Sequence, residues 1–111
     1  MGPLIITRGI TAQLTYKFYE PLATKPRAPD YSRPIDLTGL TIRFVIESDA
    51  AGKIEITDGI LTNPAAGRVD ITLTPAVTAA LPKTSFGQAY LKVIDGLGNI
   101  HRRGARRCVV V

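Results

Sequence analysis

Apolar and polar residues alternate with a period of two through most of this chain, and that alternation limits the folds open to it. Between residues 10 and 19, Leu14, Tyr16 and Phe18 fall on one side of an extended chain, with polar residues between them. Successive side chains of a β-strand point to opposite faces of a sheet. This segment is therefore predicted to be a half-buried strand.

The same alternation predicts further short strands along the chain, separated by turn residues. Ile42, Phe44 and Ile71 occupy apolar positions of clean alternations, so we expect them in the core. Turns are expected at Asp49–Gly52, Asp58–Gly59 and Asp95–Asn99. The expected strands are residues 3–8, 10–19, 40–47, 53–57, 60–61, 68–74, 86–95, 99–103 and 105–111.

One segment, residues 75–81, is predicted to be helical. Thr74 can cap a helix there, and Pro75 suits its first position. No helices are long enough for parallel crossovers, and turn signals recur every eight to twelve residues, as in sandwiches. We therefore expect an all-β, immunoglobulin-like antiparallel β-sandwich of about seven to nine strands, with one short helical turn near 75–81. The 111 residues suit one domain, 1–111.

A Pro-rich stretch at 21–34 interrupts the alternation. Its four prolines each remove a backbone donor and fix φ, so no regular sheet is expected to run through it. We interpret it as a long interaction arm that a neighbouring subunit orders, and the alternative is a solvated loop folded back over its own domain. Its candidate contact residues are Lys25, Arg27, Tyr31 and Arg33.

The formal net charge is +5, and an arginine cluster near the end of the sequence is its most conspicuous source. The cluster comprises Arg102, Arg103, Arg106 and Arg107. It can contact an acidic protein or nucleic acid, or it can be a solvated edge that discourages aggregation. Strand alternation places Arg102 and Arg103 on opposite faces. Nucleic-acid modules interleave aromatic residues with basic ones, and none follows Tyr90, so nucleic acid is the weaker interpretation.

The residues that could support catalysis are few. The chain has one histidine, His101, and one cysteine, Cys108, which is predicted to be a buried strand residue. The carboxylates fall mostly in turns or on outward strand positions, where aspartate usually binds local backbone. We therefore expect no enzyme, no catalytic residue, no metal site and no cofactor.

Compartment and membrane signals are also weak. A single cysteine allows no intrachain disulfide, which favours a reducing compartment. The N-terminal residues lack the charged leader of a signal peptide, and no apolar stretch approaches the length of a membrane helix. We expect no membrane association and no small-molecule substrate.

An ordered set of segments resembles small virion proteins of tailed bacteriophages. Pro34–Gly39, followed by the strand Leu40–Ile46, is similar to the immunoglobulin-like N-terminal domain of phage baseplate upper proteins. The resemblance continues through Gly67–Thr74 and a helical turn ending at Leu81. It extends to Tyr90–Asp95, the turn at Gly98–Ile100 and the strand after Gly104.

The resemblance implies a non-enzymatic structural component of a tailed-phage virion, assembled in the host bacterial cytoplasm. A tail or baseplate assembly protein is the first expectation, and a capsid decoration protein is the second. Its partners would be other virion proteins, with multiple copies in a symmetric assembly. Two other classes stay open: a carbohydrate-binding or adhesive module using Tyr19, Tyr31 or Tyr90, and a basic nucleic-acid binder.

Overall fold

The computed structural model describes residues 3–48 and 52–111, so most of the turn expected at Asp49–Gly52 lies outside the described residues. The fold is mostly β, with one short α-helix. The strands are β1 (Leu4–Ile6), β2 (Ala12–Lys17), β3 (Tyr19–Pro21), β4 (Pro29–Pro34), β5 (Thr41–Ser48), β6 (Gly52–Ile56), β7 (Ile60–Asn63), β8 (Arg68–Leu73), β9 (Thr84–Ile94) and β10 (Ile100–Val110). The helical elements are a 3₁₀ turn, η1 (Pro64–Ala66), and α1 (Pro75–Ala80).

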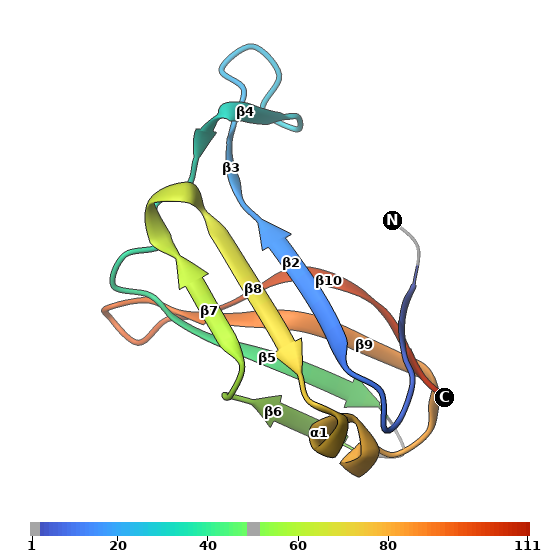
Figure 1. Cartoon of the computed structure of the whole chain (residues 1–111). Coiled ribbons are helices and arrows are strands. Elements are labelled where there is room, and N and C mark those ends of the chain that lie inside the picture. Colours follow the sequence, from blue (N-terminus) through green and yellow to red (C-terminus); the bar gives the residue numbers. More distant parts are fainter. Residues whose placement is uncertain (1–2, 49–51) are drawn as a thin grey trace.

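Two stacked sheets form the body of the molecule, and a small hairpin extends from it (Figure 1). One sheet has the strand order β1-β10-β9-β5-β6, and the other has the order β2-β8-β7. The pairings are antiparallel except that β1 runs parallel to β10. Among the described residues, none of the sheets closes into a barrel. Strands β3 and β4 pair with each other alone and form the hairpin.

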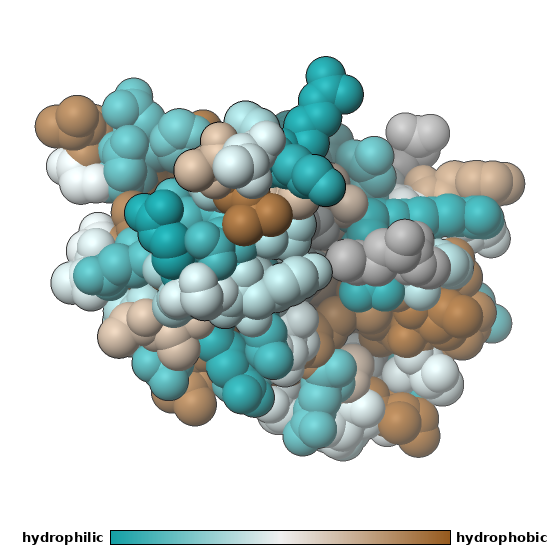
Figure 2. Space-filling model, turned by 90° about the horizontal axis from the view of Figure 1, so that it is seen from above, coloured by the Kyte–Doolittle hydropathy of each residue, from teal (hydrophilic) through white to brown (hydrophobic). Residues whose placement is uncertain are grey.

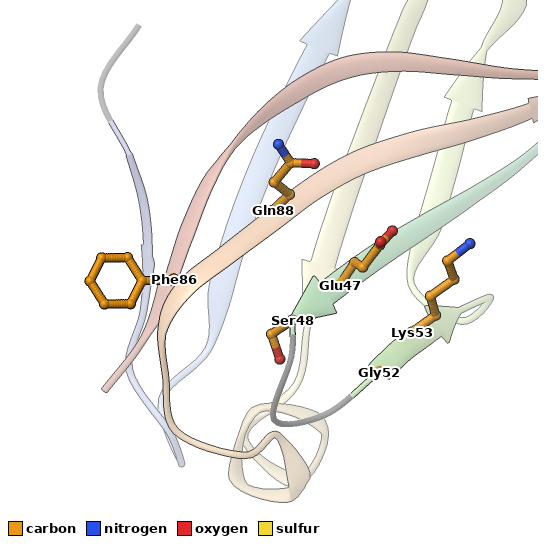
Figure 3. A pocket seen from close by; sticks show the side chains of 6 residues that line it. All are labelled: Glu47, Ser48, Gly52, Lys53, Phe86 and Gln88. Carbon is orange, nitrogen blue, oxygen red and sulfur yellow. The ribbon is translucent and has the colours of Figure 1, made fainter.

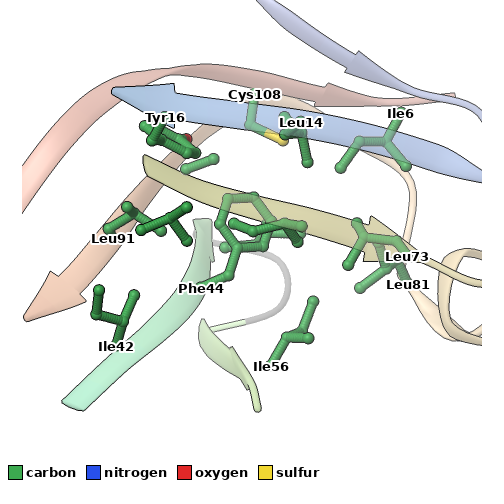
Figure 4. Close-up of a cluster of buried hydrophobic side chains, with 14 of the residues drawn as sticks. Ile6, Leu14, Tyr16, Ile42, Phe44, Ile56, Leu73, Leu81, Leu91 and Cys108 are labelled. Atoms are coloured by element: carbon green, nitrogen blue, oxygen red, sulfur yellow. The ribbon is translucent and has the colours of Figure 1, made fainter. Parts of the chain in front are cut away.

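The facing sides of the two sheets share one hydrophobic core (Figure 4). Phe44 from β5 and Leu91 from β9 are fully buried, and Ile71 from β8 is 1% exposed. The predicted core positions Ile42, Phe44 and Ile71 are thereby confirmed. Burial of such side chains stabilises a fold by about 1.5–3 kcal/mol each, so this layer supplies most of the body's stability.

Val45 departs from the predicted alternation. It lies on the polar side of β5, yet only 2% of it is exposed. Tyr90, its partner on β9, is 3% exposed on the same outer face. Long charged side chains of neighbouring strands cover both residues, as Lys and Arg stems commonly do over apolar surface.

Two predicted elements are wrong in detail. Residues 29–34, expected to be loop, form β4 and pair with β3. Proline is tolerated there because this two-stranded ribbon has free edges, where a missing N–H breaks no ladder bond. The two strands expected at 99–103 and 105–111 are one strand, β10, with a bulge between Arg103 and Arg106. Gly104 adopts φ +65° at this bulge, a conformation that favours glycine.

The predicted helix and its cap are confirmed. The Thr74 hydroxyl accepts a hydrogen bond from the Val77 amide at 3.3 Å, and Pro75 occupies the first turn. The buried Thr78 hydroxyl joins this helix to the β1–β2 turn, because it accepts from Gly9 N at 3.0 Å and donates to the Ile10 carbonyl at 2.9 Å. Within the described ranges, no helix is long and apolar enough to cross a membrane.

The turn before β5 follows the predicted local chemistry. Asp36 Oδ1 accepts hydrogen bonds from the Thr38 amide at 2.9 Å and its hydroxyl at 2.6 Å. These bonds lower the pKa of the Asp36 carboxyl, and Gly39 closes the turn at φ +80°. The turn leads the chain from the hairpin into β5 of the five-stranded sheet.

Candidate interaction surface

The β3–β4 hairpin projects beyond the end of the two stacked sheets (Figure 1). Its tip is held by backbone bonds from Leu22 N to the Ala28 carbonyl and from Ala28 N to the Lys25 carbonyl, each 2.9 Å. Lys25 and Arg27 are exposed in this tip. Figure 2 looks down on this end of the molecule and shows mainly hydrophilic side chains with separate hydrophobic groups between them. The hairpin therefore projects from the body, with charged side chains exposed at its tip.

Tyr31 is the aromatic contact of the hairpin. Its ring packs edge to face on the Tyr19 ring, with the ring centres 5.0 Å apart, yet 75% of Tyr31 is exposed. Asp30 Oδ1 accepts from the Ser32 amide at 3.0 Å and its hydroxyl at 2.6 Å, which lowers the pKa of that carboxyl. Arg33 is exposed beside them, and its charge also lowers the pKa of the Asp30 carboxyl. Tyr31 is thus exposed to solvent between an acidic and a basic residue.

Gly67 fixes the base of the hairpin. Phe18 N donates to the Gly67 carbonyl at 2.8 Å, and Ile35 N donates to the Phe18 carbonyl at 2.9 Å. Gly67 is buried at φ +61°, and a Cβ on it would lie 2.5 Å from the Phe18 oxygen and 2.8 Å from the Ile35 oxygen. Only glycine therefore allows both ends of the hairpin to approach the body this closely.

A cavity of about 530 Å³ lies in the corner between the hairpin and the body. We call it the corner cavity. One wall is β3, the opposite wall is formed by β9 and β10, and the linker around Leu37 completes it. Seven of the lining residues are apolar or aromatic, and the other four are ionisable. The lining residues are Phe18, Tyr19, Glu20, Pro21, Ile35, Leu37, Leu40, Val93, Asp95, His101 and Arg103.

Two of the four ionisable residues of the corner cavity interact with each other, and the other two lack ionic or hydrogen-bonded partners in the described part of the chain. Asp95 Oδ1 accepts from the Leu97 and Asn99 amides, both at 2.9 Å, and these backbone bonds lower the pKa of the carboxyl. Its Oδ2 lies 3.6 Å from His101 Nε2. Glu20 and Arg103 have no ionic or hydrogen-bonded partner within the described part of the chain. The cavity therefore offers one unengaged carboxylate and one unengaged guanidinium.

The four arginines of β10 do not form one patch. Arg102 and Arg103 face opposite sides of the sheet, as alternation predicts, with Arg102 on the outer face and Arg103 in the corner cavity. Arg107 also lies on the outer face, while Arg106 is half-buried near Cys108. The bulge between Arg103 and Arg106 resets the alternation.

Two aromatic rings of β9 lie under the outer arginines. The Arg102 guanidinium sits 4.7 Å from the Tyr90 ring centre, and Tyr90 donates a hydrogen bond of 3.0 Å to Glu47. Arg107 sits 5.4 Å from the ring centre of Phe86, which is 83% exposed. These contacts hold the arginine side chains against the sheet.

Other charges on this face are paired across strands. Glu55 bridges Arg43 and Lys92, each at 3.4 Å, and Glu47 lies 3.8 Å from Arg102. An open hollow of about 350 Å³ lies beside them, lined by Glu47, Ser48, Gly52, Lys53, Phe86 and Gln88. Figure 3 shows the Phe86 ring pointing away from the other labelled side chains. The hollow therefore lacks an apolar centre.

The two candidate catalytic residues do not come together. His101 faces the corner cavity, whereas Cys108 is fully buried in the core (Figure 4). Burial raises the pKa of the Cys108 thiol, an effect that the charge of Arg106 opposes. In the described part of the chain, no group of three His, Cys, Asp or Glu residues is placed to hold a metal ion.

Sequence reasoning missed the corner cavity and the aromatic partners of the arginines. The cavity combines side chains from β3, the following linker, β9 and β10. Tyr90 and Arg102 meet across a strand pair rather than along the sequence. Alternation did place Arg102 and Arg103 on opposite faces, but it could not give the register that sets Arg102 beside Tyr90.

Comparison with known proteins does not assign this surface. The chain matches no protein-family model and no curated protein sequence.

Proposed function

We propose that this chain is a non-enzymatic structural component of a tailed-phage virion, with a tail or baseplate position preferred. The projecting hairpin is the observation that carries the proposal. It presents Tyr31, Lys25 and Arg27 to solvent, and it extends from the body rather than covering it. Aromatic and arginine side chains are favoured at the centres of protein interfaces.

An immunoglobulin-like sandwich is the fold that we propose for the body. The order β2-β8-β7 corresponds to strands B, E and D, and β1-β10-β9-β5-β6 corresponds to A′, G, F, C and C′. The parallel pairing of β1 with β10 and the helix between β8 and β9 also support this assignment. The segments that resemble baseplate upper proteins lie in its central strands and their turns.

The outer face of the larger sheet favours a second candidate function, contact with a polyanion. It carries five basic side chains against two acidic ones, and Phe86 is exposed beside them. The basic residues are Arg43, Lys53, Lys92, Arg102 and Arg107, and the acids are Glu47 and Glu55. Tyr90 is buried and cannot stack on a base, so this candidate ranks second. A DNA titration at several salt concentrations tests it, because phosphate contacts give a steep salt dependence.

Particle incorporation tests the first proposal. Particles from a host carrying this locus are purified and digested, and the chain is sought by mass spectrometry. We expect the wild-type chain in purified particles, and we expect a variant with residues 22–33 replaced by a short Gly-Ser turn to fold but stay out of them. Absence of the wild-type chain would refute the virion assignment. Normal incorporation of the shortened variant would refute the role of the hairpin.

A further inference from the structure

We propose that the corner cavity receives the hairpin of a second copy of this chain, so that two copies exchange hairpins. The inference rests on the proposed role of the hairpin as an assembly element and names its partner. The cavity volume, about 530 Å³, lies within the roughly 300–1,000 Å³ of typical binding pockets. It is large enough for an aromatic side chain with its neighbouring residues.

The unengaged charges of the corner cavity define what fits it. Glu20 stands on the hairpin wall and Arg103 on the sheet wall, with apolar side chains between them. Asp95 and His101 already engage each other at 3.6 Å. A complementary occupant therefore brings an apolar group, a cation for Glu20 and an anion for Arg103.

The hairpin of this chain carries that combination. Tyr31 is 75% exposed, and it lies between Asp30 and Arg33 in the sequence. Asp30 uses Oδ1 for its bonds to Ser32, and its other oxygen makes no hydrogen bond or salt bridge in the described part of the chain, although the nearby charge of Arg33 acts on the carboxyl. In the exchanged pair, Tyr31 fills the apolar part of the cavity, Arg33 meets Glu20, and Asp30 meets Arg103.

The placement of the hairpin explains why the occupant is a second copy. Tyr31 packs on Tyr19 but is not among the residues that line the cavity of its own chain. The projecting side chain and the cavity share one element, β3–β4, at the same end of the molecule. A two-fold interface requires a surface that is complementary to itself. A projecting side chain next to a cavity that can receive it meets this requirement.

A charge-exchange experiment tests the pairing. Purified wild type, Glu20→Arg and Arg33→Glu are measured across a concentration series by sedimentation equilibrium. We expect wild type to form dimers, and each single variant to raise the dissociation constant at least about 30-fold through like-charge contact. An equimolar mixture of the two variants should regain dimers, because each mixed dimer contains one reversed pair and one native pair. Lys83→Glu, at an exposed site away from the hairpin, should dimerise like wild type.

Two further measurements separate the possible failures. Tyr31→Ser changes an exposed side chain outside the core, so it should also weaken the dimer. Its melting temperature should match wild type when both are measured at a concentration at which wild type is monomeric. A monomeric wild type, dimers that persist in the single variants, or folded variants that fail to recombine would each overturn the exchange. If the chain is monomeric yet enters particles, the exchange alone is refuted. Dimers that never enter particles would refute only the virion assignment.

Discussion

The body and the hairpin are stabilised in different ways. The body buries a continuous apolar layer between two sheets, with Phe44 and Leu91 fully inaccessible. The hairpin has one aromatic contact, between Tyr19 and Tyr31, and a few backbone bonds near its tip. Stability therefore resides in the body, and the hairpin surface is left available for contacts. Substitutions confined to one region or to the junction between the two test this division.

Truncation of a core side chain should give the largest loss. Phe44→Ala removes a fully buried ring from β5 and is expected to cost about 3–5 kcal/mol of unfolding free energy. The matched control is Phe86→Ala, because Phe86 is 83% exposed and lies on the outer face. Urea unfolding of both variants measures the difference. Similar losses for the two would show that the register of the body is wrong.

Substitution of Gly67 should give the next largest loss, because it lies where the two regions join. Gly67→Ala places a methyl group 2.5 Å from the Phe18 oxygen at a positive φ. Strain and overpacking together should cost about 2–4 kcal/mol. Gly39→Ala is the control, since Gly39 has φ +80° but no atom within 4 Å of the added Cβ. Equal melting temperatures for the two variants would contradict the close approach at the hairpin base.

A buried hydroxyl should contribute more than an exposed one of the same type. Thr78→Val leaves Gly9 N and the Ile10 carbonyl without their side-chain partner, at a cost of about 1–3 kcal/mol. Thr38→Val removes a similar local bond, to Asp36, but at the surface, and should cost less. Thermal unfolding of both variants checks the order. A smaller loss for Thr78→Val would mean that the helix is not tied to the body by this hydroxyl.

The two regions also differ in how far the sequence predicts them. Alternation located Phe44 and Ile71 because a half-buried strand repeats its environment every two residues. The Thr74 cap followed from local chemistry. The sequence did not predict β4, because prolines are typical of loops. A two-stranded ribbon nevertheless tolerates prolines on its free edges.

The candidate site was harder to predict than the body. Lys25, Arg27, Tyr31 and Arg33 were predicted as candidate contact residues, and all four are exposed, while their role in contacts stays a prediction. Alternation correctly placed Arg102 and Arg103 on opposite faces, but it could not predict the bulge at Gly104, which decides the faces of Arg106 and Arg107. A cavity depends on the packing of segments far apart in sequence, and alternation contains no information about that packing.

Removal of most of the hairpin is expected to have the smallest effect on the free energy of unfolding. Replacing residues 22–33 with a short Gly-Ser turn removes β4 up to Pro34 and the exposed Tyr31, but no residue of the hydrophobic core. The lost surface contacts should cost within about 0.5 kcal/mol, as for other surface changes. A shorter connection also lowers the entropic free-energy cost of closing the loop, by about 0.6 kcal/mol for each halving of its length. The two effects oppose each other, so the melting temperature should stay within about 3 °C of wild type. The backbone hydrogen bonds from Phe18 N to Gly67 and from Ile35 N to Phe18 remain, so the base of the hairpin stays attached to the body. Calorimetry of the shortened variant beside wild type, at a concentration at which both are monomeric, measures the shift. A large drop would show that the hairpin is part of the folding unit, and the division between body and hairpin would then be wrong.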